Sequence, residues 1–412
     1  MLGSKDFRVS EGVVLRHKAP LCKGGCQPKA DWGIVLACKP VSMAAASKTA
    51  CKYILISGVN GLSRFFSEKY KNLEPYVPGE QPKDKKYVKL NTNESPFAPS
   101  KKAQKKAAQA LEELQLYPDP ECSVLRGKIA AYYGVCPENV FVSNGSDEAL
   151  NFAFMAFCGD DTPAVFADIT YGFYPVFAQI NNLPYEIIAL EPDFSLPAEV
   201  FKRVKGTLVI ANPNAPTGLY LSFGQIEDIV RSDPERVVIV DEAYIDFGGE
   251  TAVPLTKIYD NLLVVQTFSK SRSMAGARLG FAIGNEALIN DLSTIKYSTN
   301  PYNVNRVSQA LGIGVMEDDE YTGKNCAAVI ENREYLTIEL EKLGFKVIPS
   351  SANFVFAANP EISGKDLYLG LKERGVLVRY FDRDRLYDYV RISIGTKEQL
   401  DILLDNIKAL IL

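Results

Sequence analysis

The chain has 412 residues, of which 47% are hydrophobic and 23% are charged, and its formal net charge is −4. This composition is typical of a folded globular protein, and the length is sufficient for a large core in two domains. The net charge excludes the global basic field that binds nucleic acid, so any anion site must be local. No segment approaches the ~18 uninterrupted apolar residues of a membrane helix. We therefore expect neither a nucleic-acid nor a membrane partner.

The only histidine is His17, which excludes most catalytic triads and histidine-ligated metal sites. The eight cysteines lack the CxxC spacing of zinc or redox motifs. Four of them precede residue 52, namely Cys22, Cys26, Cys38 and Cys51, and the other four are Cys122, Cys136, Cys158 and Cys326. The scattered second set predicts reduced core cysteines in a cytoplasmic protein that binds no metal.

Residues 1–62 differ from the rest of the chain. They contain nine lysines and arginines against three acids, with no sustained amphipathic period. Their apolar runs are too short for a signal peptide, and the acids argue against a transit peptide. We interpret this segment as an extension outside the main fold.

Helices and strands alternate through the middle of the chain. Amphipathic, alanine-containing patterns predict helices over residues 101–114 and 123–133. Seven apolar runs predict strands at residues 140–144, 163–169, 185–190, 207–213, 236–244, 262–268 and 280–284. Their continuous hydrophobicity predicts strands that are covered on both faces. We therefore predict an α/β fold, with a seven-stranded, mostly parallel sheet flanked by helices in a large domain over residues 101–305.

The pattern changes after residue 305. Longer helical patterns and strands at residues 353–358, 376–381 and 389–395 predict a smaller α+β domain over residues 306–412. We assign residues 63–100 to an N-terminal arm that belongs to this smaller domain.

Polar residues follow the predicted strands, where open α/β sheets bind their ligands. After the first strand, Gly145 suits a tight turn, and Ser146 and Asp147 suit the first turn of a helix. Free N–H groups and the helix dipole favour an anion there, although an ordinary N-cap has the same pattern.

Lys270 follows the sixth strand, next to Ser269 and close to Arg272 and Arg278. Such cation density favours a nucleophilic amine that reacts with an aldehyde, although a surface lysine is commoner. Asp241 ends a buried strand, where an unpaired charge is costly, and is either the partner of a ring-nitrogen cation or a turn cap. An anion cradle, an aldehyde-reactive lysine and a buried carboxylate together match pyridoxal 5′-phosphate (PLP).

Ten stretches in one order make the chain similar to the class II, fold-type I PLP-dependent aminotransferases, and among these to the histidinol-phosphate aminotransferase group. The stretches are LEPYVPG (73–79), KLNTNESPFAPS (89–100), YPDPE (117–121), SNGSDEAL (143–150), TYGFY (170–174), NPNAPTG (212–218), VDEAYIDF (240–247), TFSKSRSMAGARLGFAIG (267–284), NFVF (353–356) and RISIG (391–395). The resemblance covers roughly residues 64–412. It implies reversible, ping-pong amino transfer between L-histidinol phosphate with 2-oxoglutarate and imidazole-acetol phosphate with L-glutamate, in histidine biosynthesis.

The resemblance also implies roles for individual residues. Lys270 forms the Schiff base with PLP and moves the substrate Cα proton, Asp241 pairs with the pyridine nitrogen, and Tyr244 holds the ring 3-oxygen. The implied cofactor-binding set is completed by Ser146, Asp147, Tyr171, Asn214, Ser269, Arg278 and, from the neighbouring subunit of a homodimer, Tyr117. The implied substrate-binding set is Tyr76, Asn93, Asn353, Arg379 and Arg391, with Asn353 assisting Arg391.

Two positions depart from the family pattern. The family has an amide immediately before Pro-Thr-Gly, where this chain has Ala215, so either Asn214 supplies the amide or Tyr244 holds the ring oxygen alone. Phe97 stands where many relatives have tyrosine.

Three alternative functions share the same cofactor residues. A broad-specificity aromatic or 2-oxo-acid aminotransferase differs only in its substrate pocket. A threonine-phosphate-type PLP decarboxylase releases carbon dioxide without amino transfer. A DNA-binding regulator with an aminotransferase-like domain needs an N-terminal helix-turn-helix, and residues 1–62 show no helical pair.

Overall fold

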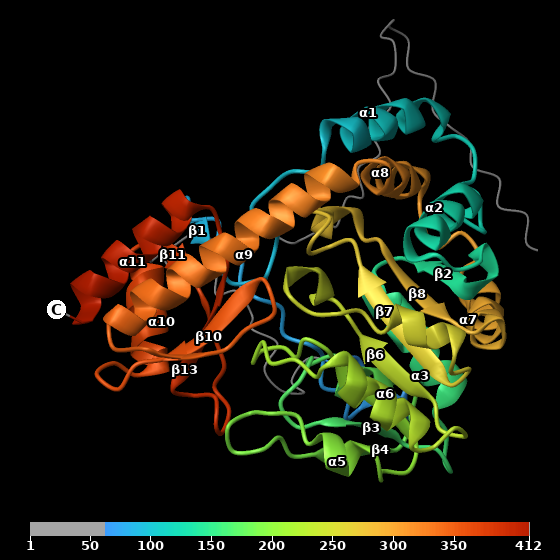
Figure 1. The fold of residues 1–412 in the computed structure, drawn as a ribbon, viewed down its shortest axis with the longest axis horizontal. Helices are drawn as coiled ribbons and strands as arrows, with labels where there is room; N and C mark the ends of the chain where they lie inside the picture. The colour runs from blue at the N-terminus through green and yellow to red at the C-terminus, as the bar shows by residue number, and fades with distance from the viewer. Residues whose placement is uncertain (1–61, 412) are drawn as a thin grey trace, which may run out of the picture. The chain divides into compact units, whose positions relative to one another are not determined.

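A computed structural model describes residues 62–411 (Figure 1). The extension predicted at residues 1–62 therefore lies outside the described residues, except for Leu62, as do His17 and the four early cysteines (Cys22, Cys26, Cys38 and Cys51). The described residues belong to one compact unit, and the predicted division into an arm and two domains stays a prediction. Within the described range, no helix has the length and apolar character needed to cross a membrane.

The predicted seven-stranded sheet is confirmed, in the order β2-β8-β7-β6-β5-β3-β4. Its strands are β2 (Val140–Ser143), β3 (Ala164–Ala167), β4 (Tyr185–Ile188), β5 (Thr207–Ala211), β6 (Val238–Asp241), β7 (Leu262–Thr267) and β8 (Gly280–Gly284). The β4–β3–β5–β6–β7 series is parallel, while β8 runs antiparallel to both β2 and β7. The carboxyl ends of the parallel strands therefore meet at one edge of the sheet.

Helices cover both faces of this sheet (Figure 1). Successive residues of a strand point to opposite faces. Accordingly, Val238 and Val240 join one core cluster, whereas Ile239 joins the other. The continuous apolar runs are therefore explained by two buried faces. The exception is β4, an edge strand in which Tyr185, Glu186 and Ile187 are exposed, so the predicted two-sided cover is wrong for this strand.

Eleven α-helices lie in the described part of the chain. They are α1 (Lys101–Ala110), α2 (Ser123–Tyr133), α3 (Ser146–Phe157), α4 (Tyr174–Ile180), α5 (Ala198–Phe201), α6 (Phe223–Arg231), α7 (Glu286–Thr299), α8 (Arg306–Met316), α9 (Asp319–Lys342), α10 (Gly364–Glu373) and α11 (Lys397–Ile411). The helix predicted over residues 123–133 is confirmed. The one predicted over residues 101–114 ends at Ala110 and continues as a 3₁₀ turn, Leu111–Glu113.

The C-terminal part of the chain builds two smaller sheets. One has the order β12-β13-β10-β9, with β9 (Lys346–Ile348), β10 (Phe354–Ala358), β12 (Arg379–Tyr380) and β13 (Tyr389–Ser393). The other pairs β1 (Val88–Lys89) from the N-terminal arm with β11 (Val376–Leu377). The single strand predicted at residues 376–381 is therefore divided between two sheets. Helices α9, α10 and α11 contribute to the apolar core beside these strands.

The four described cysteines are free thiols. Cys122, Cys158 and Cys326 are buried, and burial raises the pKa of the Cys158 thiol to about 11. Cys136 is exposed, so the prediction of a core position is wrong for this residue.

Candidate active site

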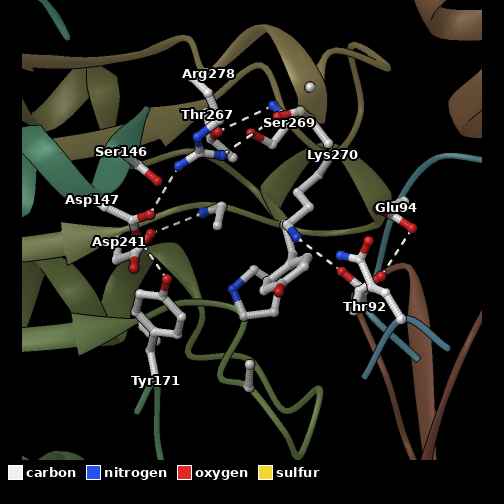
Figure 2. Close-up of a pocket in the computed structure, with 18 residues that line it drawn as sticks. Thr92, Glu94, Ser146, Asp147, Tyr171, Asp241, Thr267, Ser269, Lys270 and Arg278 are labelled. Carbon is white, nitrogen blue, oxygen red and sulfur yellow. Dashed lines mark hydrogen bonds and ion pairs between the residues drawn. The ribbon is translucent and has the colours of Figure 1, made fainter. Parts of the chain in front are cut away.

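A cavity of about 380 Å³ lies at the carboxyl ends of β5, β6 and β7 and beside the first turn of α3 (Figure 2). The residues in its wall come from segments far apart in the sequence. Eight of the predicted cofactor-binding residues line it, namely Ser146, Asp147, Tyr171, Asp241, Tyr244, Ser269, Lys270 and Arg278. The parallel order of the strands explains this convergence, because their carboxyl ends share one sheet edge.

One side of the cavity combines the start of α3 with a cation. Arg278 donates from Nη2 to Asp147 Oδ2 at 3.0 Å, and the Tyr171 hydroxyl donates to Asp147 Oδ1 at 2.7 Å (Figure 2). Gly145 precedes the helix with a φ of 82°, and a Cβ there would lie 2.7 Å from Arg278 Nη2. Glycine therefore allows the guanidinium to approach the helix N-terminus. Free N–H groups, the helix dipole and Arg278 together make a cradle for a phosphate.

Asp241, the last residue of β6, is the buried carboxylate of the site and is 5% exposed. The Tyr174 hydroxyl donates to its Oδ2 at 2.9 Å, and the Ala243 N–H donates to its Oδ1 at 3.2 Å. Burial raises the pKa of Asp241 to about 6, although these hydrogen bonds and Lys270 oppose the shift. A cationic ring nitrogen brought next to this carboxylate would stabilise its charged form.

Lys270 extends into the cavity from the turn after β7 (Figure 2). Its Nζ donates to the Thr92 carbonyl oxygen at 3.4 Å and lies 5.6 Å from the centre of the Tyr244 ring. The Tyr244 hydroxyl accepts from Asn93 Nδ2 at 3.1 Å, so its own proton is available to a ligand. The amine and the phenol therefore present reactive groups to the same cavity.

Asn214 and its neighbour Ala215 lie differently. Asn214 is fully buried and donates from Nδ2 to the Ile169 carbonyl at 2.9 Å and to Thr217 Oγ1 at 3.0 Å. It is not among the residues that line the cavity, whereas Ala215 is. The N–H groups of its side-chain amide are thus engaged with the protein, and the predicted role of Asn214 toward the ring 3-oxygen stays a prediction.

Arg272 also lies away from the cavity, although it was counted in the sequence among the cations close to Lys270. Its guanidinium is buried and pairs with Asp246 Oδ2 at 2.8 Å. Asp246 also accepts a hydrogen bond from Ser271. Since Ser271 directly follows Lys270, and Asp246 lies in the turn that begins after Tyr244, this ion pair connects the loops that carry the two reactive groups.

A second cavity of about 630 Å³ shares Lys270 and Tyr244 with the first and opens toward the smaller sheets. The predicted substrate-binding residues Tyr76, Asn93, Arg379 and Arg391 line it. Asn353 does not. The side chain of Asn353 donates from Nδ2 to the Asn93 carbonyl of the arm at 3.0 Å, and the assistance to Arg391 that the sequence suggested stays a prediction. Arg391 donates to the Asn91 carbonyl at 3.1 Å.

Tyr117, the residue predicted to reach a neighbouring subunit, lies outside both cavities. Its side chain is 76% exposed and stacks on Tyr302 with ring centres 4.5 Å apart. Leu111, Leu114 and Leu116 are also exposed in the same segment.

Several residues at the site did not emerge from the sequence. Tyr174 binds Asp241, Thr92 accepts from Lys270, and Arg383 lines the second cavity. Tyr174 stands three residues after Tyr171 in the TYGFY stretch, so its position was a usable signal. The Thr92 contact uses a backbone oxygen and therefore has no side-chain signature.

The residues around the first cavity fit PLP. The Lys270 amine can react with the aldehyde of PLP, and the buried Asp241 carboxylate suits its pyridinium nitrogen. The start of α3 together with Arg278 suits its phosphate. The adjoining cavity adds guanidinium groups that suit carboxylates and phosphates.

Comparisons with known proteins agree with this chemistry. The family model "Aminotransferase class I and II" matches residues 85–407. A histidinol-phosphate aminotransferase from Clostridium botulinum (strain Langeland) is 50% identical over 353 residues, which are 85% of this chain and 99% of that protein. One from Brachyspira hyodysenteriae is 49% identical over 352 residues, again 85% and 99% of the two chains. A crystal structure of histidinol-phosphate aminotransferase from Sinorhizobium meliloti, in complex with pyridoxal-5′-phosphate, has the same fold, with a TM-score of 0.76 and 21% identity over 85% of this chain and 98% of that one.

Proposed function

Because the chain belongs to the class I and II aminotransferase family, we propose that it is a PLP-dependent enzyme that transfers the amino group between L-histidinol phosphate and 2-oxoglutarate. The observation that carries the proposal is that two adjoining cavities are both lined by Lys270. One suits the cofactor, and the other presents arginines to an anionic substrate. Relatives at about half identity over nearly their whole length bear the histidinol-phosphate aminotransferase name.

PLP, when bound, supplies an aldehyde that takes up the substrate amino group and a ring that accepts the electron pair released at the substrate Cα. The rest is done by the protein. Asp241, a buried carboxylate, would keep the ring nitrogen protonated, and the Tyr244 hydroxyl, whose proton is not used in its contact with Asn93, would donate to the ring 3-oxygen. The start of α3, Ser269 and Arg278 line the same cavity and would hold the phosphate.

Lys270 has two tasks in this proposal. Its Nζ binds the cofactor between turnovers, and the amine that substrate displaces then carries the proton from the substrate Cα. The chain thus needs no histidine for proton transfer, which agrees with the single histidine at position 17. Arg379 and Arg391 bind the anionic group of each substrate in turn, because a guanidinium suits both carboxylate and phosphate.

We further propose a homodimer with shared sites, located in the cytoplasm, where its cysteines stay reduced. The exposed apolar segment that contains Leu111, Leu114, Leu116 and Tyr117 suits burial against a second copy. In that dimer Tyr117 would reach the cofactor phosphate of the partner. Light scattering on the purified protein is expected to give twice the chain mass, and a monomer with full activity would contradict the proposal.

An absorbance experiment tests the substrate. PLP-loaded protein is mixed with L-histidinol phosphate alone, which is expected to abolish the band of the lysine-bound cofactor, and 2-oxoglutarate is then expected to restore it. Aromatic amino acids that abolish the band while histidinol phosphate does not would indicate a different aminotransferase. Release of carbon dioxide without amino transfer would indicate a decarboxylase.

A further inference from the structure

The cavity on the substrate side has an excess of positive charge. Three arginines line it, Arg379, Arg383 and Arg391, and Glu74 is the single carboxylate side chain that does so within the described part of the chain. A concave site lined by one sign of charge concentrates ligands of the opposite sign. Two of these arginines were expected from the sequence, and Arg383 was not.

Arg379 and Arg391 face each other across neighbouring strands. They are direct register partners of the antiparallel β12–β13 pair, and like charges in such positions oppose strand pairing. Each donates to a backbone carbonyl of the N-terminal arm, Arg379 to Val77 at 3.1 Å and Arg391 to Asn91 at 3.1 Å. Arg391 Nε is buried without a hydrogen-bond partner. An anion between the two guanidinium groups would satisfy both.

Arg383 lies in the loop that joins β12 to β13, and a neighbouring residue anchors that loop. Arg385 donates to Asp168 Oδ2 at 3.3 Å, to the Leu190 carbonyl at 3.2 Å and to the Glu191 carbonyl. These three acceptors belong to the large-sheet part of the molecule, near β3 and β4. The loop is therefore fixed at both its strand ends and its middle, and Arg383 is held in the cavity wall.

The guanidinium of Arg383 is exposed and makes no ion pair or hydrogen bond with another residue in the range 62–411. The other arginines nearby are engaged, Arg379 with the arm and Arg385 with Asp168. Arg383 is thus available to a ligand at the solvent-exposed part of the cavity. Arg391 is less exposed than Arg383 and can bind a ligand deeper in the cavity.

We propose that Arg383 is a third substrate-binding arginine that selects for the phosphate group, an inference that rests on the proposed function. A phosphate monoester carries up to about two charges on three terminal oxygens, whereas a carboxylate has one charge on two oxygens. Arg379 and Arg391 suffice for a carboxylate. The third oxygen and second charge of a phosphate are matched by Arg383, so it assists histidinol phosphate and leaves glutamate largely unaffected.

The test compares R383Q and R383K with a control, R203Q. Arg203 is likewise exposed, has no side-chain partner within residues 62–411, and does not line either cavity, so its loss changes the net charge equally. The two half-reactions are followed separately on PLP-loaded protein. Binding of inorganic phosphate is measured by calorimetry on the same samples.

R383Q is expected to raise the half-saturating concentration of histidinol phosphate and the Kd of inorganic phosphate by about 5- to 30-fold, the usual effect of one charge-assisted contact. The half-saturating concentration of glutamate is expected to change less than about twofold. R383K is expected to recover part of the lost affinity for the phosphate ligands, and R203Q is expected to bind all ligands as the unchanged enzyme does.

The inference would be overturned if R383Q and the unchanged enzyme had the same half-saturating concentration of histidinol phosphate and the same Kd for inorganic phosphate. It would also be overturned if R383Q raised the half-saturating concentration of glutamate as much as that of histidinol phosphate. Failure of the unchanged enzyme to react with histidinol phosphate would instead overturn the proposed function. In that event the calorimetry still decides the role of Arg383. Weaker phosphate binding by R383Q supports an arginine that selects another phosphorylated substrate, and unchanged binding contradicts it.

Discussion

At the cofactor end of the pocket, charged side chains pair with other side chains, as Arg278 does with Asp147 and Asp241 with the Tyr174 hydroxyl. At the substrate end, the hydrogen bonds that Arg379 and Arg391 donate within the described part of the chain all go to backbone carbonyls of the N-terminal arm. The first arrangement holds one resident molecule in one orientation. The second leaves the two guanidinium groups without a carboxylate partner among residues 62–411, which suits a carboxylate substrate in one half-reaction and a phosphate in the other.

The first way to break the cofactor end is to remove its amine. K270A is expected to lower kcat by at least about 10⁴-fold, because both the covalent attachment of PLP and proton transfer depend on Nζ. The absorbance band of the lysine-bound cofactor should also be absent. K324A serves as the control, because Lys324 pairs with Glu320 on an exposed surface outside both cavities. A K270A variant that retains activity within tenfold would rule out the proposed role.

The next largest effect is expected for Asp241, the buried carboxylate of the same end. D241N keeps the acceptor for the Tyr174 hydroxyl but removes the charge that holds the ring nitrogen protonated. We expect kcat to fall about 10²- to 10³-fold, as for other preorganised electrostatic contacts. Steady-state rates measured at saturating substrate check this, and a loss under threefold would contradict it.

D241N lowers kcat, but the same substitution is expected to raise the stability of the cofactor-free protein at neutral and alkaline pH. Burial raises the pKa of Asp241 from 3.8 to about 6, so the folded state favours the protonated carboxyl. The resulting stabilisation is fully present below about pH 4 and is lost as the pH rises through about 6. D241N should therefore be more stable than the unchanged protein at pH 8, by at most about 3 kcal/mol, and similar at pH 4. Urea unfolding at the two pH values tests this; equal stability at pH 8 would show that the charge carries no penalty.

The substrate end is probed by a substitution that keeps the charge. R391K retains a cation but loses the planar pair of donors, so kcat/KM for both histidinol phosphate and glutamate should fall about 10- to 100-fold. The absorbance of the bound cofactor should stay unchanged, since Arg391 does not line the cofactor cavity. An altered cofactor spectrum would show that the two ends are coupled more strongly than their contacts indicate.

The smallest effect is expected at Ala215, where the family pattern has an amide. A215N adds a donor beside the proposed position of the ring 3-oxygen, but Tyr244 already offers its proton there, so PLP affinity should change less than about fivefold. N214A is the matched control, because Asn214 bonds only to the protein and its loss should cost about 1–3 kcal/mol of stability. Spectroscopic titration with PLP and urea unfolding distinguish the two results.

The sequence by itself predicted the seven strands, the α/β class and eight of the residues that line the cofactor cavity. The apolar runs were sufficient for the strands because nearly all are buried on both faces. The exception is β4, an edge strand whose residues are mostly exposed, whereas β2 at the opposite edge is buried throughout. The residues that follow the strands were sufficient for the cavity because parallel order brings their carboxyl ends together.

Only the tertiary structure decided which partner each side chain contacts. Arg272 and Arg278 look alike in the sequence, yet the first pairs with Asp246 in the interior and the second faces the cavity. Asn214 and Ala215 are adjacent, yet only Ala215 lines the site. Arg383 reaches the substrate cavity because Arg385 anchors its loop to Asp168, a residue 217 positions away. Such pairings depend on the packing of segments that are distant in the chain, and no local pattern of residues encodes them.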